Sequence, residues 1–300
     1  MSDFLEQMAA GSRERLEVAR RGRSEADLLH TAGSMAPAPK LTLHPARFDL
    51  IAELKLRSPA VGQLKSGDEN VAARVTSYAH AGAAAISVLT EPSRFDGSMD
   101  HLAQATRALA PLNVPAMRKD FLVDPYQVVE ARVAGAGGVL VIIRMLSRTG
   151  IQEMLECARS LGLFVLLEAF DEADIEVMHQ VLPRGPEPVM SMGTGSTAGQ
   201  TSARHAFPGS PHGALVLAGL NCRDLATLQI VPQRLIELAH LLPTHVPRVA
   251  ESGVLTPADA ARVAAAGYEL ALVGSALMQG GDPHTHTLAS AMLTAGRQSR

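Results

Sequence analysis

The chain has 300 residues, 47% of them hydrophobic, so it can bury one large core or the cores of two smaller domains. Its 27 lysines and arginines against 30 aspartates and glutamates give a net charge of −3, which argues against nucleic acid or an anionic membrane as a partner. The two cysteines, Cys157 and Cys222, are too few and too far apart for a disulfide framework or a zinc site. A small-molecule partner and a reducing compartment are therefore expected.

The N-terminal segment has none of the features of a targeting signal. Acids stand where a secretion signal has a basic start, and no apolar run approaches the ~20 residues of a membrane span, which predicts a soluble, cytoplasmic protein. A helix is predicted over residues 4–21, followed by a connector that contains Pro37 and Pro39. We expect residues 1–47 to form a helical extension that lies across the main domain.

From about residue 48 onward, short apolar runs alternate with helical patterns. This alternation is typical of repeated strand–helix units around a parallel sheet. Eight strands are predicted, at residues 50–54, 85–89, 114–117, 138–143, 164–167, 215–220, 248–250 and 270–273.

Residues with known capping effects mark the helices between these strands. Proline follows Asp124, Val231 and Thr256, where the first helical turn does not need the missing N–H. Ser66 and Glu69 have the spacing of a capping box. Glycines are placed to end four of the helices, at Gly82, Gly135, Gly162 and Gly267.

Eight parallel strands can form an open sheet or a closed barrel. No Gly-x-Gly-x-x-Gly pattern follows the first predicted strand, as a nucleotide-binding open sheet would require. We therefore predict an α/β fold, a (β/α)₈ TIM barrel over residues 48–300. In such barrels the chemistry takes place at the C-terminal ends of the strands.

Residues 183–213 interrupt the repeat between the fifth predicted helix and the sixth predicted strand. They are rich in glycine, serine, threonine and proline and show little apolar periodicity. We expect a flexible insertion on the N-terminal face of the barrel, remote from the chemistry, because surface loops tolerate added length at small entropic cost.

Charged residues gather where the predicted strands end. The first strand supplies Glu53 near its end and Lys55 just after it, and Lys119 follows the third strand, Glu168 the fifth and Glu251 the seventh. Any one of these charges could be a solvated residue at the rim. Their convergence predicts an active site, because partly buried charges need partners or a function.

Small residues follow the last two strands. Ser252-Gly253 and Gly274-Ser275 offer free backbone N–H groups at the position where barrels commonly hold a phosphate group. Each turn alone is a weak signal, but two on adjacent strands favour a phosphorylated substrate.

Five sequence blocks resemble the indole-3-glycerol-phosphate synthase family. They are IAELKLRSP at 51–59, SVLTE at 87–91 with FDGS at 95–98, RKDFLVDPY at 118–126, GLNCRDL at 219–225 and AESG at 250–253. The resemblance runs from about residue 50 to 280, in family order.

The resemblance implies a carbon–carbon lyase of tryptophan biosynthesis. Its substrate would be 1-(2-carboxyphenylamino)-1-deoxyribulose 5-phosphate, which cyclises, loses carbon dioxide and then loses water to give indole-3-glycerol phosphate. No metal or organic cofactor is implied. Ring closure needs an acid that protonates the ribulose carbonyl, and dehydration needs an acid–base pair.

The same resemblance suggests roles for individual residues. Lys119 matches the general acid of ring closure, and Glu168 and Glu53, with Lys55 beside them, match the acid–base groups; which of them serves dehydration stays open. The positions that match substrate contacts are Phe95 for the aromatic ring, Asn221 and Arg223 for orientation, Ser58, Gly253, Gly274 and Ser275 for the phosphate, and Glu251 and Ser252 for the floor of the site.

Two alternatives are compatible with these residues. A paralogous barrel lyase could act on a related amino-ribulose phosphate, and a non-catalytic phosphate-binding barrel could use residues 183–213 to hold a partner. The second alternative gives no reason to keep Lys119, Glu168 and Glu53 together. The sequence leaves the oligomeric state open, and a monomer is compatible with it.

Overall fold

The computed structural model describes residues 3–44, 48–59, 62–64, 69–182, 215–279 and 281–300. Eight parallel strands form a closed barrel in the order β1-β10-β9-β8-β7-β6-β5-β4, and the pairing of β1 with β4 closes it. The strands are β1 Asp49–Leu54, β4 Ala85–Leu89, β5 Ala116–Lys119, β6 Gly138–Ile142, β7 Phe164–Ala169, β8 Val216–Asn221, β9 Arg248–Glu251 and β10 Leu270–Val273. The predicted (β/α)₈ barrel is confirmed.

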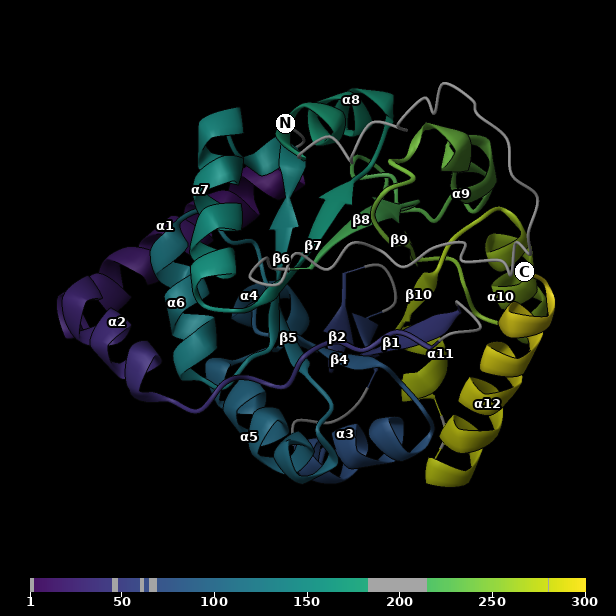
Figure 1. The fold of residues 1–300 in the computed structure, drawn as a ribbon, viewed down its shortest axis with the longest axis horizontal. Coiled ribbons are helices and arrows are strands. Elements are labelled where there is room, and N and C mark those ends of the chain that lie inside the picture. The colour runs from purple at the N-terminus through teal and green to yellow at the C-terminus, as the bar shows by residue number, and fades with distance from the viewer. Residues whose placement is uncertain (1–2, 45–47, 60–61, 65–68, 183–214, 280) are drawn as a thin grey trace, which may run out of the picture.

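Helices surround the strands on the outside of the barrel (Figure 1). The longer ones are α3 Val71–His80, α5 Met99–Leu109, α6 Pro125–Val133, α7 Arg148–Ser160, α8 Glu172–Val181, α10 Pro257–Ala265 and α12 Asp282–Gln298. Shorter turns are α4 Pro92–Phe95, α9 Gln233–Glu237, α11 Ser275–Met278 and the 3₁₀ turns Ala110–Leu112, Ile143–Met145 and Ala239–Leu241. After β1, a small hairpin forms from β2 Arg57–Ser58 and β3 Gly62–Gln63, which the sequence pattern did not predict.

Side-chain caps explain most of the predicted helix starts, with two corrections. Asp124 caps α6, and Thr256 forms a capping box at the start of α10. Pro232 is itself the residue before α9 rather than its first helical residue. The capping box predicted from Ser66 and Glu69 is wrong, because Asn70 caps α3 by accepting a hydrogen bond from the N–H of Ala73 at 3.0 Å. Ser66 itself lies outside the described residues.

The four glycines predicted to end helices all follow the last helical turn with positive φ. The φ angles are 92° at Gly82, 90° at Gly135, 70° at Gly162 and 101° at Gly267. Left-handed backbone costs glycine little because it has no Cβ. Each of the four turns then leads directly into the next strand.

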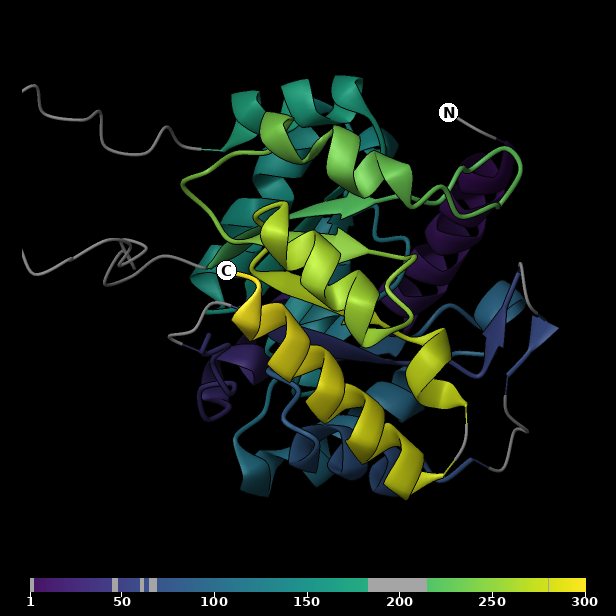
Figure 2. The same cartoon turned by 90° about the vertical axis from the view of Figure 1, so that its right-hand side faces the viewer.

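The N-terminal extension contains two helices, α1 Asp3–Gly22 and α2 Glu25–Ser34, of which only the first was predicted. Leu5, Met8 and Ala9 of α1 are buried against apolar side chains from inside the barrel, such as Ile51 and Leu166. Helix α1, drawn in purple, lies at the same end of the barrel as the β2–β3 hairpin, and the chain's C-terminus lies at the other end (Figure 2). Helix α1 therefore covers the end of the barrel at which the strands finish, whereas α2 packs against α6.

The predicted insertion at residues 183–213 lies outside the described residues, so its flexibility stays a prediction. Helix α8 ends at Val181 and β8 begins at Val216, which places both attachment points on the N-terminal side of the barrel. Within the part of the chain that is described, no helix is long and apolar enough to cross a membrane.

Candidate active site

One pocket at the C-terminal ends of the strands contains every site residue predicted from the sequence. These residues are Glu53, Lys55, Ser58, Phe95, Lys119, Glu168, Asn221, Arg223, Glu251, Ser252, Gly253, Gly274 and Ser275. Seven of the eight barrel strands, with the turns that follow them, supply these groups. Side chains alternate between the two faces of a strand, and this alternation explains why the acids converge. Ile51 and Leu166 point into the core of the barrel, and Glu53 and Glu168, two positions later, point the same way one layer above.

Lys119 lies between two buried acids. Its Nζ is 3.6 Å from Oε1 of Glu168 and 3.7 Å from Oε2 of Glu251, and the carboxylates are only 2% and 1% exposed. Gly219 of β8 makes room for this cluster, because a Cβ at that position would overlap the carboxylate of Glu251. The ammonium of Lys119 is therefore held at the centre of the pocket by charges from β7 and β9.

Glu53 and Lys55 form a second pair on the other side of the pocket. Nζ of Lys55 donates to Oε1 of Glu53 at 2.6 Å. A Cβ at Gly274 would lie 2.6 Å from the same oxygen and 3.2 Å from the ammonium, so only glycine allows the end of β10 to approach the pair this closely. The backbone of a proposed phosphate-binding turn thus lies against a proposed acid–base pair.

The cluster changes the proton affinities of its members in different directions. Burial favours the neutral form of Glu53, but the charges of Lys55 and Lys119 outweigh burial and lower its pKa. Burial also works against the charge of Lys119, yet Glu168 and Glu251 together raise its pKa. For Glu251, burial and the nearby charge of Glu168 both act against ionisation, and its pKa lies well above the ordinary value.

Asn221 ends β8 and Arg223 follows it, and the two residues connect the charged cluster to the rim of the pocket. Nδ2 of Asn221 donates to Oε1 of Glu168 at 2.8 Å, and its Oδ1 accepts the backbone N–H of Arg223 at 3.0 Å. The Arg223 guanidinium donates to the carbonyl of Leu228 at 2.7 Å. The amide of Asn221 therefore fixes the orientation of Glu168.

The four residues predicted to hold phosphate line the same pocket from three strand ends. Ser58 lies in the β2–β3 hairpin, Gly253 has a φ of 71°, and Gly274 immediately precedes Ser275, the first residue of α11. First-turn N–H groups of a helix have no partners within the helix and can bind an anion. Among the described residues, no group of three or more histidines, cysteines or acids is arranged to hold a metal ion.

Sequence reasoning missed most of the apolar wall of the pocket. Phe4 and Leu5 of α1 line it, together with Phe121 and Phe170, each of which stands two positions after a charged site residue. The ring centroid of Phe121 lies 5.9 Å from that of Phe4 and 6.0 Å from that of Phe95. Reading each strand end two residues further would have found Phe121 and Phe170, but nothing in the sequence placed α1 over the pocket.

Comparison with known proteins identifies one family. The family model described as indole-3-glycerol phosphate synthase matches residues 5–184 and 212–289. A relative from Parafrankia sp. (strain EAN1pec) with that name is 36% identical over 295 residues, which cover 97% of this chain and 96% of the relative. A relative of the same name from Bordetella pertussis is 32% identical, over 94% of this chain and 97% of its own.

Solved structures with low sequence identity share the fold. The structure of 3-hexulose-6-phosphate synthase from Salmonella typhimurium superposes with a TM-score of 0.57 at 13% identity, covering 84% of this chain and all of the other. That of thiamine phosphate pyrophosphorylase from Pyrococcus furiosus gives 0.54 at 12% identity, covering 85% and 98%. At this identity the likeness supports the barrel architecture alone.

Proposed function

The chain belongs to the indole-3-glycerol phosphate synthase family, and we propose that it catalyses the family's reaction, closing the indole ring of indole-3-glycerol phosphate in tryptophan biosynthesis. The substrate is 1-(2-carboxyphenylamino)-1-deoxyribulose 5-phosphate. The observation that carries this assignment is Lys119, held 3.6 Å from Glu168 and 3.7 Å from Glu251 in the pocket that contains all the matched site residues.

In the first step the aromatic carbon that bears the carboxylate attacks the ribulose carbonyl. Lys119 donates a proton to the carbonyl oxygen as it becomes a hydroxyl. The neighbouring carboxylates raise the pKa of Lys119, so the lysine enters the reaction protonated. Loss of carbon dioxide from the same carbon then restores the aromatic ring.

Dehydration follows and needs both an acid and a base. Glu168 is oriented by Asn221 and lies beside Lys119, whereas Glu53 is paired with Lys55. Each pair joins a carboxylate to an ammonium, so each can accept one proton and deliver another. The variants Glu168→Gln and Glu53→Gln distinguish them: the pair that serves dehydration is the one whose loss makes a decarboxylated, still hydrated intermediate accumulate.

Substrate binding divides the pocket into a polar and an apolar side. We assign the phosphate to the turns that contain Ser58, Gly253, Gly274 and Ser275, and the aromatic ring to the wall that contains Phe95. The family match and the shared pocket support this division. A cytoplasmic location belongs to the same proposal, and the separate, unpaired thiols of Cys157 and Cys222 support it.

The direct test is to incubate the purified protein with the carboxyphenylamino-deoxyribulose phosphate and to follow the fluorescence of the indole product. The chain contains no tryptophan, so its own emission in this range is low. We expect fluorescence to increase with wild-type protein and to stay at background with Glu168→Gln. Equal signals from both proteins would remove Glu168 from the mechanism, and no signal from folded wild type would overturn the proposed function.

A further inference from the structure

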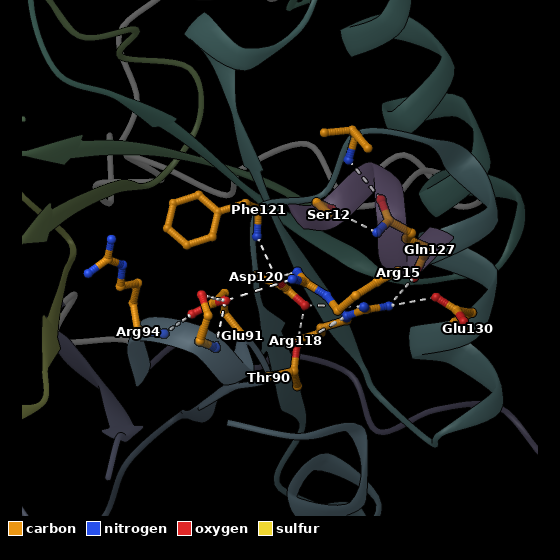
Figure 3. Close-up of polar contacts among 12 residues, drawn as sticks. Ser12, Arg15, Thr90, Glu91, Arg94, Arg118, Asp120, Phe121, Gln127 and Glu130 are labelled. Carbon is orange, nitrogen blue, oxygen red and sulfur yellow. Dashed lines mark hydrogen bonds and ion pairs between the residues drawn. The ribbon is translucent and has the colours of Figure 1, made fainter. Parts of the chain in front are cut away.

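We propose that Arg15 of the N-terminal helix is a positioning residue for the active site, because it joins α1 to the strand end that carries Lys119 and to the turn that carries Phe95. The inference rests on the proposed function above. Nη2 of Arg15 lies 2.8 Å from Oδ1 of Asp120, and its Nη1 lies 3.7 Å from Oε1 of Glu91. Figure 3 shows the guanidinium between these two carboxylates.

Asp120, directly after Lys119, is buried and fully hydrogen-bonded. Its Oδ1 accepts from Arg15 and from the N–H of Phe121, both at 2.8 Å. Its Oδ2 accepts from the Thr90 hydroxyl at 2.7 Å and from the Arg118 guanidinium at 3.2 Å. Four donors leave this carboxylate one orientation, and the backbone on both sides of it is fixed accordingly.

Glu91 organises the next turn along the mouth of the barrel. Its carboxylate accepts the N–H groups of Ser93 at 2.8 Å and Arg94 at 2.7 Å, and so caps the short helix α4. Phe95 is the last residue of that helix. Arg15 is the only cation recorded near this buried acid among the described ion pairs, so the turn that carries Phe95 depends on α1 for charge compensation.

The same helix supplies part of the pocket wall. Phe4 and Leu5, at the start of α1, line the pocket, and the rings of Phe4, Phe121 and Phe95 form a continuous series. These three rings come from the three segments that Arg15 joins. The guanidinium of Arg15 therefore fixes the position of the apolar wall relative to the end of β5, where Lys119 lies. It does so without contacting the substrate.

Arg20 provides a matched control on the same helix. Its Nη2 also lies 2.8 Å from a carboxylate oxygen of the β5–α6 turn, that of Asp124, but this pair is more exposed and does not line the pocket. Loss of either arginine weakens the docking of α1. Only loss of Arg15 is expected to disturb the pocket.

The experiment compares steady-state kinetics and thermal unfolding of Arg15→Gln, Arg15→Lys and Arg20→Gln. Arg15→Gln is expected to lower kcat/KM about tenfold, with a raised KM and a lowered kcat, since small displacements of substrate-contacting groups have large effects on rate. Arg15→Lys should recover part of the loss, because an ammonium can reach one carboxylate but not both. Arg20→Gln should stay within about twofold of wild type, whatever its melting temperature.

Several results would overturn the proposal. One is a folded Arg15→Gln variant whose kcat/KM stays within twofold of wild type. Another is an Arg20→Gln variant that loses as much kcat/KM as Arg15→Gln does. If Arg15→Gln does not fold, wild-type kinetics in Arg15→Lys would have the same consequence.

Failure of the proposed function can be told apart from failure of this inference. If wild type does not turn over the substrate, the proposed function is wrong, and hydrogen exchange of the α1 amides then decides about Arg15. Faster exchange at the start of α1 in Arg15→Gln than in Arg20→Gln supports the positioning role. Equal exchange in the two variants overturns it.

Discussion

Two clusters of buried charge lie at the same end of the barrel and differ in how completely they are hydrogen-bonded. Asp120 accepts hydrogen bonds from four donors. Glu251 is equally buried, yet neither of its oxygens has a hydrogen-bond partner among the described residues, and Oε2 of Glu53 also lacks one. Buried polar groups are normally satisfied, and because Glu53 and Glu251 both line the pocket, we expect a bound ligand to complete their hydrogen bonding.

The comparison separates positioning from chemistry. The Asp120 cluster joins α1 to the barrel and has no capacity for a further ligand, whereas the Glu251 cluster keeps charge and hydrogen-bonding capacity free at a cost in stability. Substitutions in the first cluster should change stability and positioning. Substitutions in the second should change turnover with little loss of stability.

The largest expected effect is on turnover in the second cluster. Lys119→Ala should lower kcat by at least ~100-fold and leave the fold intact, because it removes a general acid that acts in the transition state. Steady-state assays of indole formation, with circular dichroism as a control for folding, measure this effect. Unchanged turnover would remove Lys119 from the mechanism.

A second prediction tests the polar side of the pocket. Ser275→Asp should raise KM much more than it lowers kcat, because the new carboxylate would repel the substrate phosphate. Inorganic phosphate should protect wild type against heat, and should protect the variant less. If phosphate protects neither protein, the phosphate site has been misplaced.

A third prediction compares how substitutions of Asp120 and Glu251 change the stability of the protein. Asp120→Asn should lower the free energy of unfolding by about 2 kcal/mol, because a neutral amide cannot accept from all four donors that hydrogen-bond to Asp120, and it removes the charge that faces Arg118 and Arg15. Glu251→Gln should not lower it, since this acid forms no hydrogen bond that the amide would lose. Urea unfolding of the two variants measures both values, and equal losses would contradict the distinction between the clusters.

The raised pKa of Glu251 predicts that the difference in stability between wild type and Glu251→Gln depends on pH. Between its ordinary pKa of about 4.5 and the higher value in the fold, the folded protein holds a proton that the unfolded chain releases. Stability supplied by the protonated carboxyl is therefore lost as pH rises through this window. The stability of wild type minus that of Glu251→Gln should fall as pH increases above about 4.5, and a difference independent of pH would show that Glu251 ionises normally.

The smallest effect is expected at residues 184–211, which stand between α8 and β8 in the sequence. Replacing them by a short Gly-Ser linker should leave kcat and KM within about twofold and change stability by no more than ~1 kcal/mol, because loop-closure entropy varies slowly with length. Kinetics and urea unfolding of the shortened chain measure both. Loss of activity in a shortened protein that still folds would mean that the segment reaches the site or mediates a required assembly.

The sequence predicted the strands, and the convergence of the charged residues in one pocket, for a physical reason. Apolar runs between caps such as Asp124 and stops such as Gly135 mark strand–helix units, and a closed barrel brings the residues after every strand together. Lys119, Glu168 and Glu251 could therefore be grouped before the structure was known. The sequence could not predict that Asp120 is fully hydrogen-bonded and Glu251 is not, because hydrogen bonding depends on the orientation of side chains.

The errors fell where local patterns are short or contacts are distant. The β2–β3 hairpin has two residues in each strand, too few for any period to be visible, and Ser24 caps α2 without a strong apolar pattern after it. The contact between Arg15 and Asp120 spans 105 positions, a separation that no local pattern encodes. The wall supplied by α1 was missed for the same reason.

The central claim is that this mouth of the barrel performs ring closure with loss of carbon dioxide. The most direct measurement follows indole fluorescence and released carbon dioxide together in one reaction of the wild-type protein with the carboxyphenylamino-deoxyribulose phosphate. One molecule of carbon dioxide should appear for each indole formed, and both should be lost in Lys119→Ala. Consumption of the substrate without either product, by folded wild-type protein, would contradict the account.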